Sequence, residues 1–89
     1  MNVKARAKFM ELYGPITGSG TDGSHYDYYR VSYWIDNATA SFSVSNVDTN
    51  REFISYLRSL KWGSDVDVYL RVTKSKKTNN WYVNLDPKF

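Results

Sequence analysis

Apolar and polar residues alternate in five segments of the chain, which is the period of strands with one buried face. The segments are residues 2–12, 27–35, 38–45, 65–73 and 81–85. In the first, the apolar face consists of Val3, Ala5, Ala7 and Phe9, and the polar face of Lys4, Arg6 and Lys8. In the last two, the inward positions are Val66, Val68, Leu70 and Val72, then Trp81, Val83 and Leu85. We therefore predict five half-buried strands.

The second and third strands form a hairpin if Asp36 and Asn37 are a two-residue turn. One face then pairs apolar or aromatic residues, namely Ile35 with Ala38, Tyr33 with Ala40, Val31 with Phe42 and Tyr29 with Val44. The other face pairs Trp34 with Thr39, Ser32 with Ser41, Arg30 with Ser43 and Tyr28 with Ser45. A slip of one residue would mix the two sets, so the register is specified. We call the second face the shelf.

The three longer segments that connect the predicted strands differ in composition. Residues 13–25, "YGPITGSGTDGSH", hold four of the five glycines and one of the two prolines, which predicts a long loop. Residues 49–63 predict a helix, because "TNRE" fits a capping box with Thr49 as N-cap and Gly63 is placed to end it. Phe53, Leu57 and Leu60 recur at helical spacing within it. Residues 74–80, "KSKKTNN", predict a basic turn before the last strand.

Five short strands with one helix between the third and fourth resemble the OB-fold, a mainly β, five-stranded Greek-key barrel, over residues 1–89 as one domain. That fold binds oligonucleotides and oligosaccharides around its second and third strands and the loops joining strands 1–2 and 4–5. The sequence "GSGTDGSHY" before the second strand is also similar to small single-stranded DNA-binding proteins of phages and plasmids. This resemblance implies a loop that contacts DNA, a homodimer that coats a strand, and a role in replication.

Composition excludes several other classes. With no cysteine and one histidine, the chain offers no disulfide, thiolate zinc site or nucleophile pair, and we expect neither a metal, a cofactor nor an enzyme. The chain lacks an apolar leader and any run long enough to span a membrane, so we expect a cytoplasmic protein. The three Trp, eight Tyr and four Phe are too many for so small a core, and some must serve recognition.

The charge is +3, from twelve Lys and Arg against nine Asp and Glu, and the cations cluster. Cations beside surface aromatics predict sequence-nonspecific binding of single-stranded DNA, in which bases stack on Tyr28 and Trp34 and Arg30 contacts phosphate. Further phosphate contacts are expected from Lys4, Arg6, Lys8, Lys74, Lys76 and Lys77. Secondary candidates are Tyr26, Tyr69, Arg71 and Tyr82.

Two alternatives remain open at this point. The same shelf is suited to a protein-interaction module, such as a phage inhibitor or accessory subunit, because Tyr, Trp and Arg are enriched in interface hot spots. RNA is the other alternative partner, since contact with a 2′-hydroxyl leaves no motif in a sequence. Added salt separates the classes, because nucleic-acid binding weakens steeply with salt and an aromatic protein interface changes little.

Overall fold

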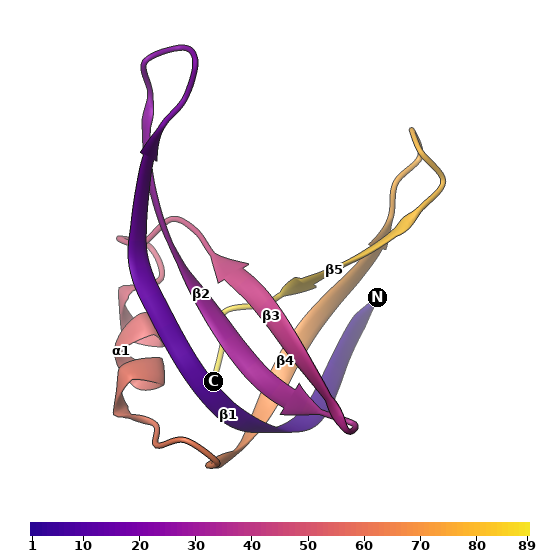
Figure 1. The fold of residues 1–89 in the computed structure, drawn as a ribbon. Coiled ribbons are helices and arrows are strands. Elements are labelled where there is room, and N and C mark those ends of the chain that lie inside the picture. The colour runs from indigo at the N-terminus through magenta and orange to yellow at the C-terminus, as the bar shows by residue number, and fades with distance from the viewer.

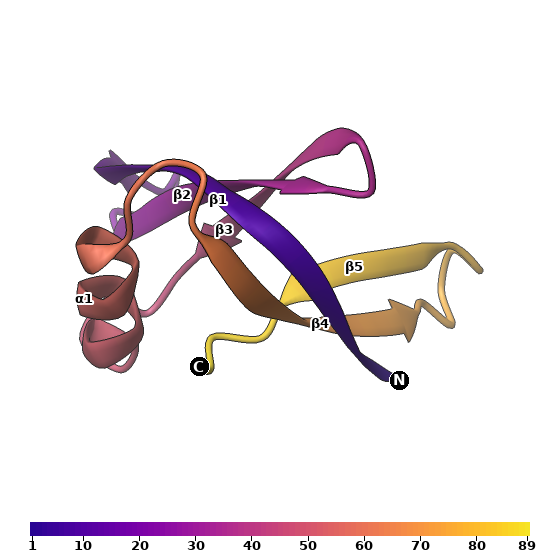
Figure 2. The ribbon, with the colours of Figure 1, turned by 90° about the horizontal axis from the view of Figure 1, so that it is seen from below.

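The computed structural model describes residues 1–89 as five antiparallel strands and one helix. The elements are β1 (Asn2–Ser19), β2 (His25–Ile35), β3 (Ala38–Val44), α1 (Arg51–Ser59), β4 (Asp65–Lys74) and β5 (Trp81–Leu85). The sheet has the order β3-β2-β1-β4-β5, and its two edge strands approach each other, so it forms a nearly closed barrel (Figure 1). Figure 2 shows α1 on the side away from the β4–β5 turn. The predicted mainly β, OB-like arrangement is confirmed.

Strand β1 holds the barrel together because it pairs with two neighbours in succession. Its first part, residues 2–8, pairs with β4, and residues 8–19 pair with β2. Lys8 lies at the change of partner, opposite both Asp65 and Trp34. The ladder with β2 is interrupted between Phe9 and Glu11 and again between Tyr13 and Ile16. Such bulges bend a strand, which allows one 18-residue strand to follow a curved sheet.

The predicted long loop at residues 13–25 is wrong. Strand β1 continues to Ser19 and β2 begins at His25, so the two form a projecting hairpin, and only residues 20–24 make the turn. Ile16 pairs with Tyr28 and Thr17 with Asp27, so residues that favour strands outweigh the neighbouring glycines. In the turn, Asp22 accepts hydrogen bonds from the hydroxyl and the N–H of Ser24, and these lower its pKa. We call residues 14–28 the first arm.

The core confirms most of the predicted inward positions. Its eleven buried residues are Ala7, Phe9, Tyr29, Val31, Tyr33, Val44, Phe53, Ile54, Leu57, Val66 and Val68. Three predicted inward residues are exceptions, because Val3 is 40% exposed, Trp81 is 60% exposed and Val83 is 49% exposed, whereas Leu85 of β5 packs against the core. The β4–β5 hairpin extends past the barrel, and its turn projects on the same side as the first arm (Figure 1). We call residues 72–83 the second arm.

The predicted hairpin of β2 and β3 is confirmed in its turn and in its register. Asp36 and Asn37 have φ values of 49° and 64°, as a type I′ turn requires. Every predicted pair from Ile35–Ala38 to Tyr29–Val44 is present. The last predicted pair, Tyr28 with Ser45, lies outside the ladder because β3 ends at Val44. The shelf therefore exists as one face of the β2–β3 ladder.

The predicted helix is correct in place but too long. The N-cap of α1 is Asn50, not Thr49, and it makes no side-chain cap hydrogen bond, so the predicted capping box does not form. The side-chain amide of Asn50 instead donates to the carbonyl of Ser45 (2.7 Å). Leu60 is already extended, with ψ 145°, and the helix ends before Gly63. Gly63 has φ 84° and donates its N–H to the carbonyl of Phe9 (2.7 Å), which ties the α1–β4 loop to β1. The nine-residue helix is too short to cross a membrane.

Buried Tyr33 makes stability sensitive to alkaline pH. Burial of its ring, with a smaller effect of Tyr56, raises the pKa of the Tyr33 hydroxyl above its usual 10.0. Because the folded pKa exceeds the unfolded one, this contribution is complete below the unfolded pKa and is lost as pH rises from there towards the folded pKa. As pH rises from about 9 to about 11, we expect the free energy of unfolding to fall less in Tyr33→Phe than in the wild type. Urea unfolding at several pH values measures this, and parallel curves for the two proteins would contradict it.

Candidate nucleic-acid interface

A groove runs between the bases of the two arms. Its first part is a cavity of about 560 Å³ between residues 25–28 of β2 and the loop that follows β3. Its second part, about 350 Å³, shares Ser45, Asn46 and Thr49 with the first and reaches Arg71 and Leu85. We call this continuous depression the inter-arm groove. It runs from the first arm to β4 and β5, next to the base of the second arm.

Two tyrosines of the first arm form an aromatic platform at the groove. Tyr26 and Tyr28 occupy alternate positions on one face of β2, and their rings stack with centroids 6.1 Å apart and planes 28° apart. Gly18 pairs with Tyr26, and a Cβ on Gly18 would lie 2.3 Å from the Tyr26 hydroxyl oxygen, so the ring lies directly over the glycine. Tyr26 remains 50% exposed. Tyr28 is half-buried, so the pair offers a stacked aromatic surface that is open mainly at Tyr26.

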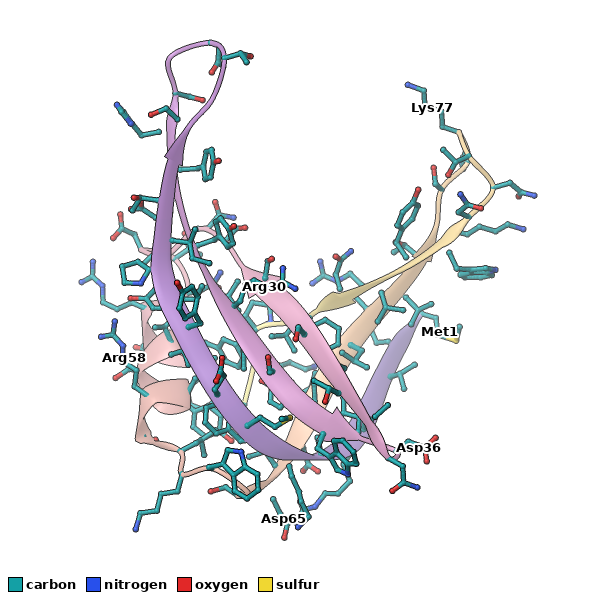
Figure 3. All side chains as sticks on the ribbon, viewed as in Figure 1. Met1, Arg30, Asp36, Arg58, Asp65 and Lys77 are labelled. Carbon is teal, nitrogen blue, oxygen red and sulfur yellow. The ribbon has the colours of Figure 1, made fainter.

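Arg30 continues this face along β2. Its Nη1 donates to Oγ of Ser43 (3.3 Å), a residue that lines the second part of the groove. Figure 3 shows Arg30 at the base of the space between the two arms. Tyr13 lies opposite Arg30 on β1 and is 64% exposed. Tyr13 was not among the predicted site residues, because its position was predicted to lie in the long loop.

The opposite wall comes from β4 and β5. Arg71 lines the groove, and its Nη2 lies 3.4 Å from Oδ1 of Asp86 in an ion pair. Tyr82 pairs with Thr73, two residues beyond Arg71 and on the same face of the sheet, and it is 46% exposed. Thus Arg71 and Tyr82, predicted as secondary candidates, belong to the groove side. Tyr69 is half-buried, with Nζ of Lys88 4.8 Å from its ring centre, and does not line it.

Cations gather at the turn of the second arm. Lys76 and Lys77 are exposed and have no carboxylate partner, and Lys77 lies at the end of the arm in Figure 3. The Ser75 hydroxyl accepts the N–H groups of Lys77 (3.2 Å) and Thr78 (3.3 Å), which holds the turn. Lys74 places Nζ 5.7 Å from the centre of the exposed Trp81 ring. Trp81 was predicted to lie in the core, so its exposed ring, like that of Tyr13, was not among the predicted site residues.

The cations of β1 lie elsewhere and are largely neutralised. Lys8 contacts Asp65 (3.1 Å) and Arg6 contacts Asp67 (3.3 Å), each directly across the β1–β4 ladder. Lys4 lies opposite Tyr69 in the same ladder. These exposed pairs contribute at most about 1 kcal/mol each to stability, but they remove free charge from this surface. The structure does not bring Lys4, Arg6 and Lys8 to the inter-arm groove.

Trp34 is also separated from the groove. It is six residues along β2 from Tyr28, which corresponds to about 20 Å in a strand. Trp34 lines a different cavity together with Trp62, near the β2–β3 turn. The predicted shelf is therefore one face with two ends: Tyr28 and Arg30 at the groove, and Trp34 at the other.

The groove is not uniformly positive. Asp27 and Asp48 line its first part, and Arg71 lines its second part but is paired with Asp86. Arg30 and the lysines of the second arm are not among the residues that line either part. The chain forms no group of three or more His, Cys, Asp or Glu side chains that could hold a metal ion.

Comparisons with family models, with curated proteins and with solved structures find no match for this chain.

Gly14 fixes the base of the first arm. Its φ is 140°, and a Cβ there would lie 2.9 Å from Cδ2 of Tyr29 and 3.2 Å from the carbonyl oxygen of Tyr28. We expect Gly14→Ala to lower the free energy of unfolding by about 1–3 kcal/mol, because both the backbone and its neighbours must shift. Urea denaturation measures the loss, with Thr17→Ala on the exposed arm as the control. Equal stability of the two variants would show that this position is not constrained.

Proposed function

We propose that the protein binds single-stranded DNA without strong sequence preference, along the inter-arm groove. The observation that carries the proposal is the stacked pair of the exposed Tyr26 and the half-buried Tyr28, on the strand face that Arg30 continues and on the side where both arms project. Binders of this class combine aromatic platforms with cations that follow the backbone. The OB-like barrel supports the proposal, because that fold binds oligonucleotides around its second and third strands and the connections flanking them.

In the proposed mechanism, bases stack on Tyr26 and Tyr28 at one wall and on Tyr82 at the other. Stacking tolerates any base, because every base has a π-face, and each platform contributes about 1–3 kcal/mol. Ser43, Ser45 and Asn46 line the floor between the walls and offer hydroxyl and amide groups to sugar and phosphate. Arg30, Lys76 and Lys77 attract the phosphates and make binding sensitive to salt.

A homodimer forms part of the proposal. One groove in a domain of this size covers few nucleotides, so two linked copies bind a strand more tightly than either does alone. The resemblance to phage and plasmid proteins supports such a dimer, a cytoplasmic location, and protection of exposed strands during replication. In this mechanism RNA oligomers compete with DNA for the same groove. The Kd values for oligo-dT and oligo-rU measure the preference between DNA and RNA.

Removal of the tyrosine platform should weaken DNA binding. We expect Tyr28→Ala to raise the Kd for a fluorescent dT oligomer about tenfold, because a stacking platform is lost. Trp34→Ala, on the same strand face but at the other end, should change Kd less than about twofold, because it leaves every groove contact in place. Fluorescence anisotropy at low salt measures both, after circular dichroism has established that the variants fold. The reverse order would place the DNA on Trp34 instead of the groove.

Release of Arg71 from its ion pair should strengthen binding. Asp86→Asn removes the carboxylate 3.4 Å from Arg71, so a guanidinium on the groove wall becomes free for phosphate. We expect the Kd for the dT oligomer to fall about threefold and the salt slope, log K against log salt, to steepen by at most about one. Asp27→Asn also removes one negative charge at the groove, but Asp27 forms no ion pair, so this change frees no cation. A similar gain in both variants would mean that net charge alone matters.

A further inference from the structure

The backbone conformation of Gly18 does not require a glycine. Three of the five glycines have positive φ values, which other residues rarely adopt, but Gly18 is not one of them. Gly18 lies within the ladder of the first arm, where it pairs with Tyr26. A glycine inside a strand weakens the strand, because it offers no side chain to pack and loses more entropy on folding. Such a glycine marks a place where another group approaches the backbone closely.

The ring of Tyr26 is the group that approaches Gly18. A Cβ at position 18 would overlap Oη, Cζ and Cε2 of Tyr26, the last at 2.8 Å, and these are its three nearest atoms. The neighbouring pair on the same strand face, Ile16 with Tyr28, carries a side chain on both strands. At Gly18, therefore, a ring from β2 can lie against the backbone of β1.

This contact holds the most open part of the aromatic platform. Tyr26 is 50% exposed, and its ring stacks on that of the half-buried Tyr28 with centroids 6.1 Å apart. Exposed side chains exchange rapidly between rotamers unless their neighbours restrict them. Contacts with the backbone at Gly18 and with the Tyr28 ring restrict Tyr26 to the stacked position.

A ring that is already in place binds a base at a lower entropic cost. Ordering of a mobile side chain on binding reduces affinity, and preorganisation removes that cost. A methyl group at position 18 would force the Tyr26 ring away from this position and from its stack on Tyr28. The overlapping atoms are the far end of an exposed side chain, so the ring can move without disturbing the barrel. The effect of the methyl group therefore falls on the platform and not on the fold.

We propose that Gly18 is a positioning residue for DNA binding and acts through Tyr26. Its lack of a side chain places the Tyr26 ring in the stacked orientation that receives a base. This inference rests on the proposed function, because it assigns to Gly18 a part in the same site. It also gives a reason for a glycine in the ladder of the first arm, where the strand itself gains nothing from one.

A double-mutant cycle on oligo-dT binding tests the role. We expect Gly18→Ala to raise the Kd about three- to tenfold, and no more than Tyr26→Ala does. In the Tyr26→Ala background, Gly18→Ala should change the Kd less than about twofold, because the ring through which Gly18 acts is absent. Thr17→Ala, on the opposite face of the same strand, is the control and should bind as the wild type does. Fluorescence anisotropy at low salt measures each Kd.

Proton NMR of the free protein tests the geometry without DNA. In the wild type we expect nuclear Overhauser contacts between Hα of Gly18 and Hε of Tyr26, and between the rings of Tyr26 and Tyr28. In Gly18→Ala the contacts between the two rings should weaken, while the circular dichroism spectrum and the unfolding midpoint in urea stay close to those of the wild type. Thr17→Ala should keep every contact.

Four outcomes would overturn the positioning role. Two concern binding: a Kd for Gly18→Ala equal to that of the wild type, or an undiminished effect of Gly18→Ala in the Tyr26→Ala background. Two concern structure: no contact between Gly18 and Tyr26 in the wild type, or a large loss of stability in Gly18→Ala, which would show a role in the fold. If the wild type itself does not bind oligo-dT, the proposed function fails and this role fails with it. Any of the four outcomes in a wild type that binds oligo-dT leaves the proposed function intact.

Discussion

The change of partner along β1 is the constraint on which the rest of the structure depends. One strand supplies a ladder to β4 with its first residues and a ladder to β2 with the remainder, and Lys8 stands at the junction. Because the same strand serves both neighbours, the sheet must curve, and the bulge after Phe9 provides the bend. The inward residues Ala7 and Phe9 then meet the core from this bend. The two arms lie on either side of the change of partner, because β2 belongs to the first arm and β4 to the second.

The barrel separates two kinds of surface on opposite ends. At the arms, polar side chains line an open groove, the stacked rings of Tyr26 and Tyr28 share a strand face with Arg30, and Lys76 and Lys77 remain unpaired. At the other end, ion pairs neutralise Arg6 and Lys8, and Trp34 and Trp62 surround an apolar cavity. Long-range attraction of a polyanion needs free cations, which the second arm supplies, whereas the apolar cavity offers a nucleotide few polar partners. The two ends of the barrel therefore differ in the interactions that they can make.

Local sequence patterns predicted the barrel well, because strands and tight turns each leave a short-range signal in the sequence. Alternation identified the five strands, and the Asp36–Asn37 turn gave the register of β2 and β3 pair by pair. Two long-range effects escaped the sequence. Pairing of Ile16 and Thr17 with β2 turned a glycine-rich stretch into strand, and the extension of β5 past the barrel exposed Trp81. The same limit applies to the shelf: the sequence placed Tyr28 and Trp34 on one face, but the cavities that divide them involve Ser45 and Trp62 from other elements.

Photocrosslinking of an oligo-dT strand that carries 4-thiothymidine tests whether bases stack on the tyrosines of the inter-arm groove. After irradiation and digestion, mass spectrometry identifies the residues that lie against the bases. If the strand lies in this groove, crosslinks form on Tyr26, Tyr28 and Tyr82 and are lost when unlabelled strand competes. Crosslinks concentrated on Trp34 or Trp62, with the tyrosines of the groove unmodified, would contradict it.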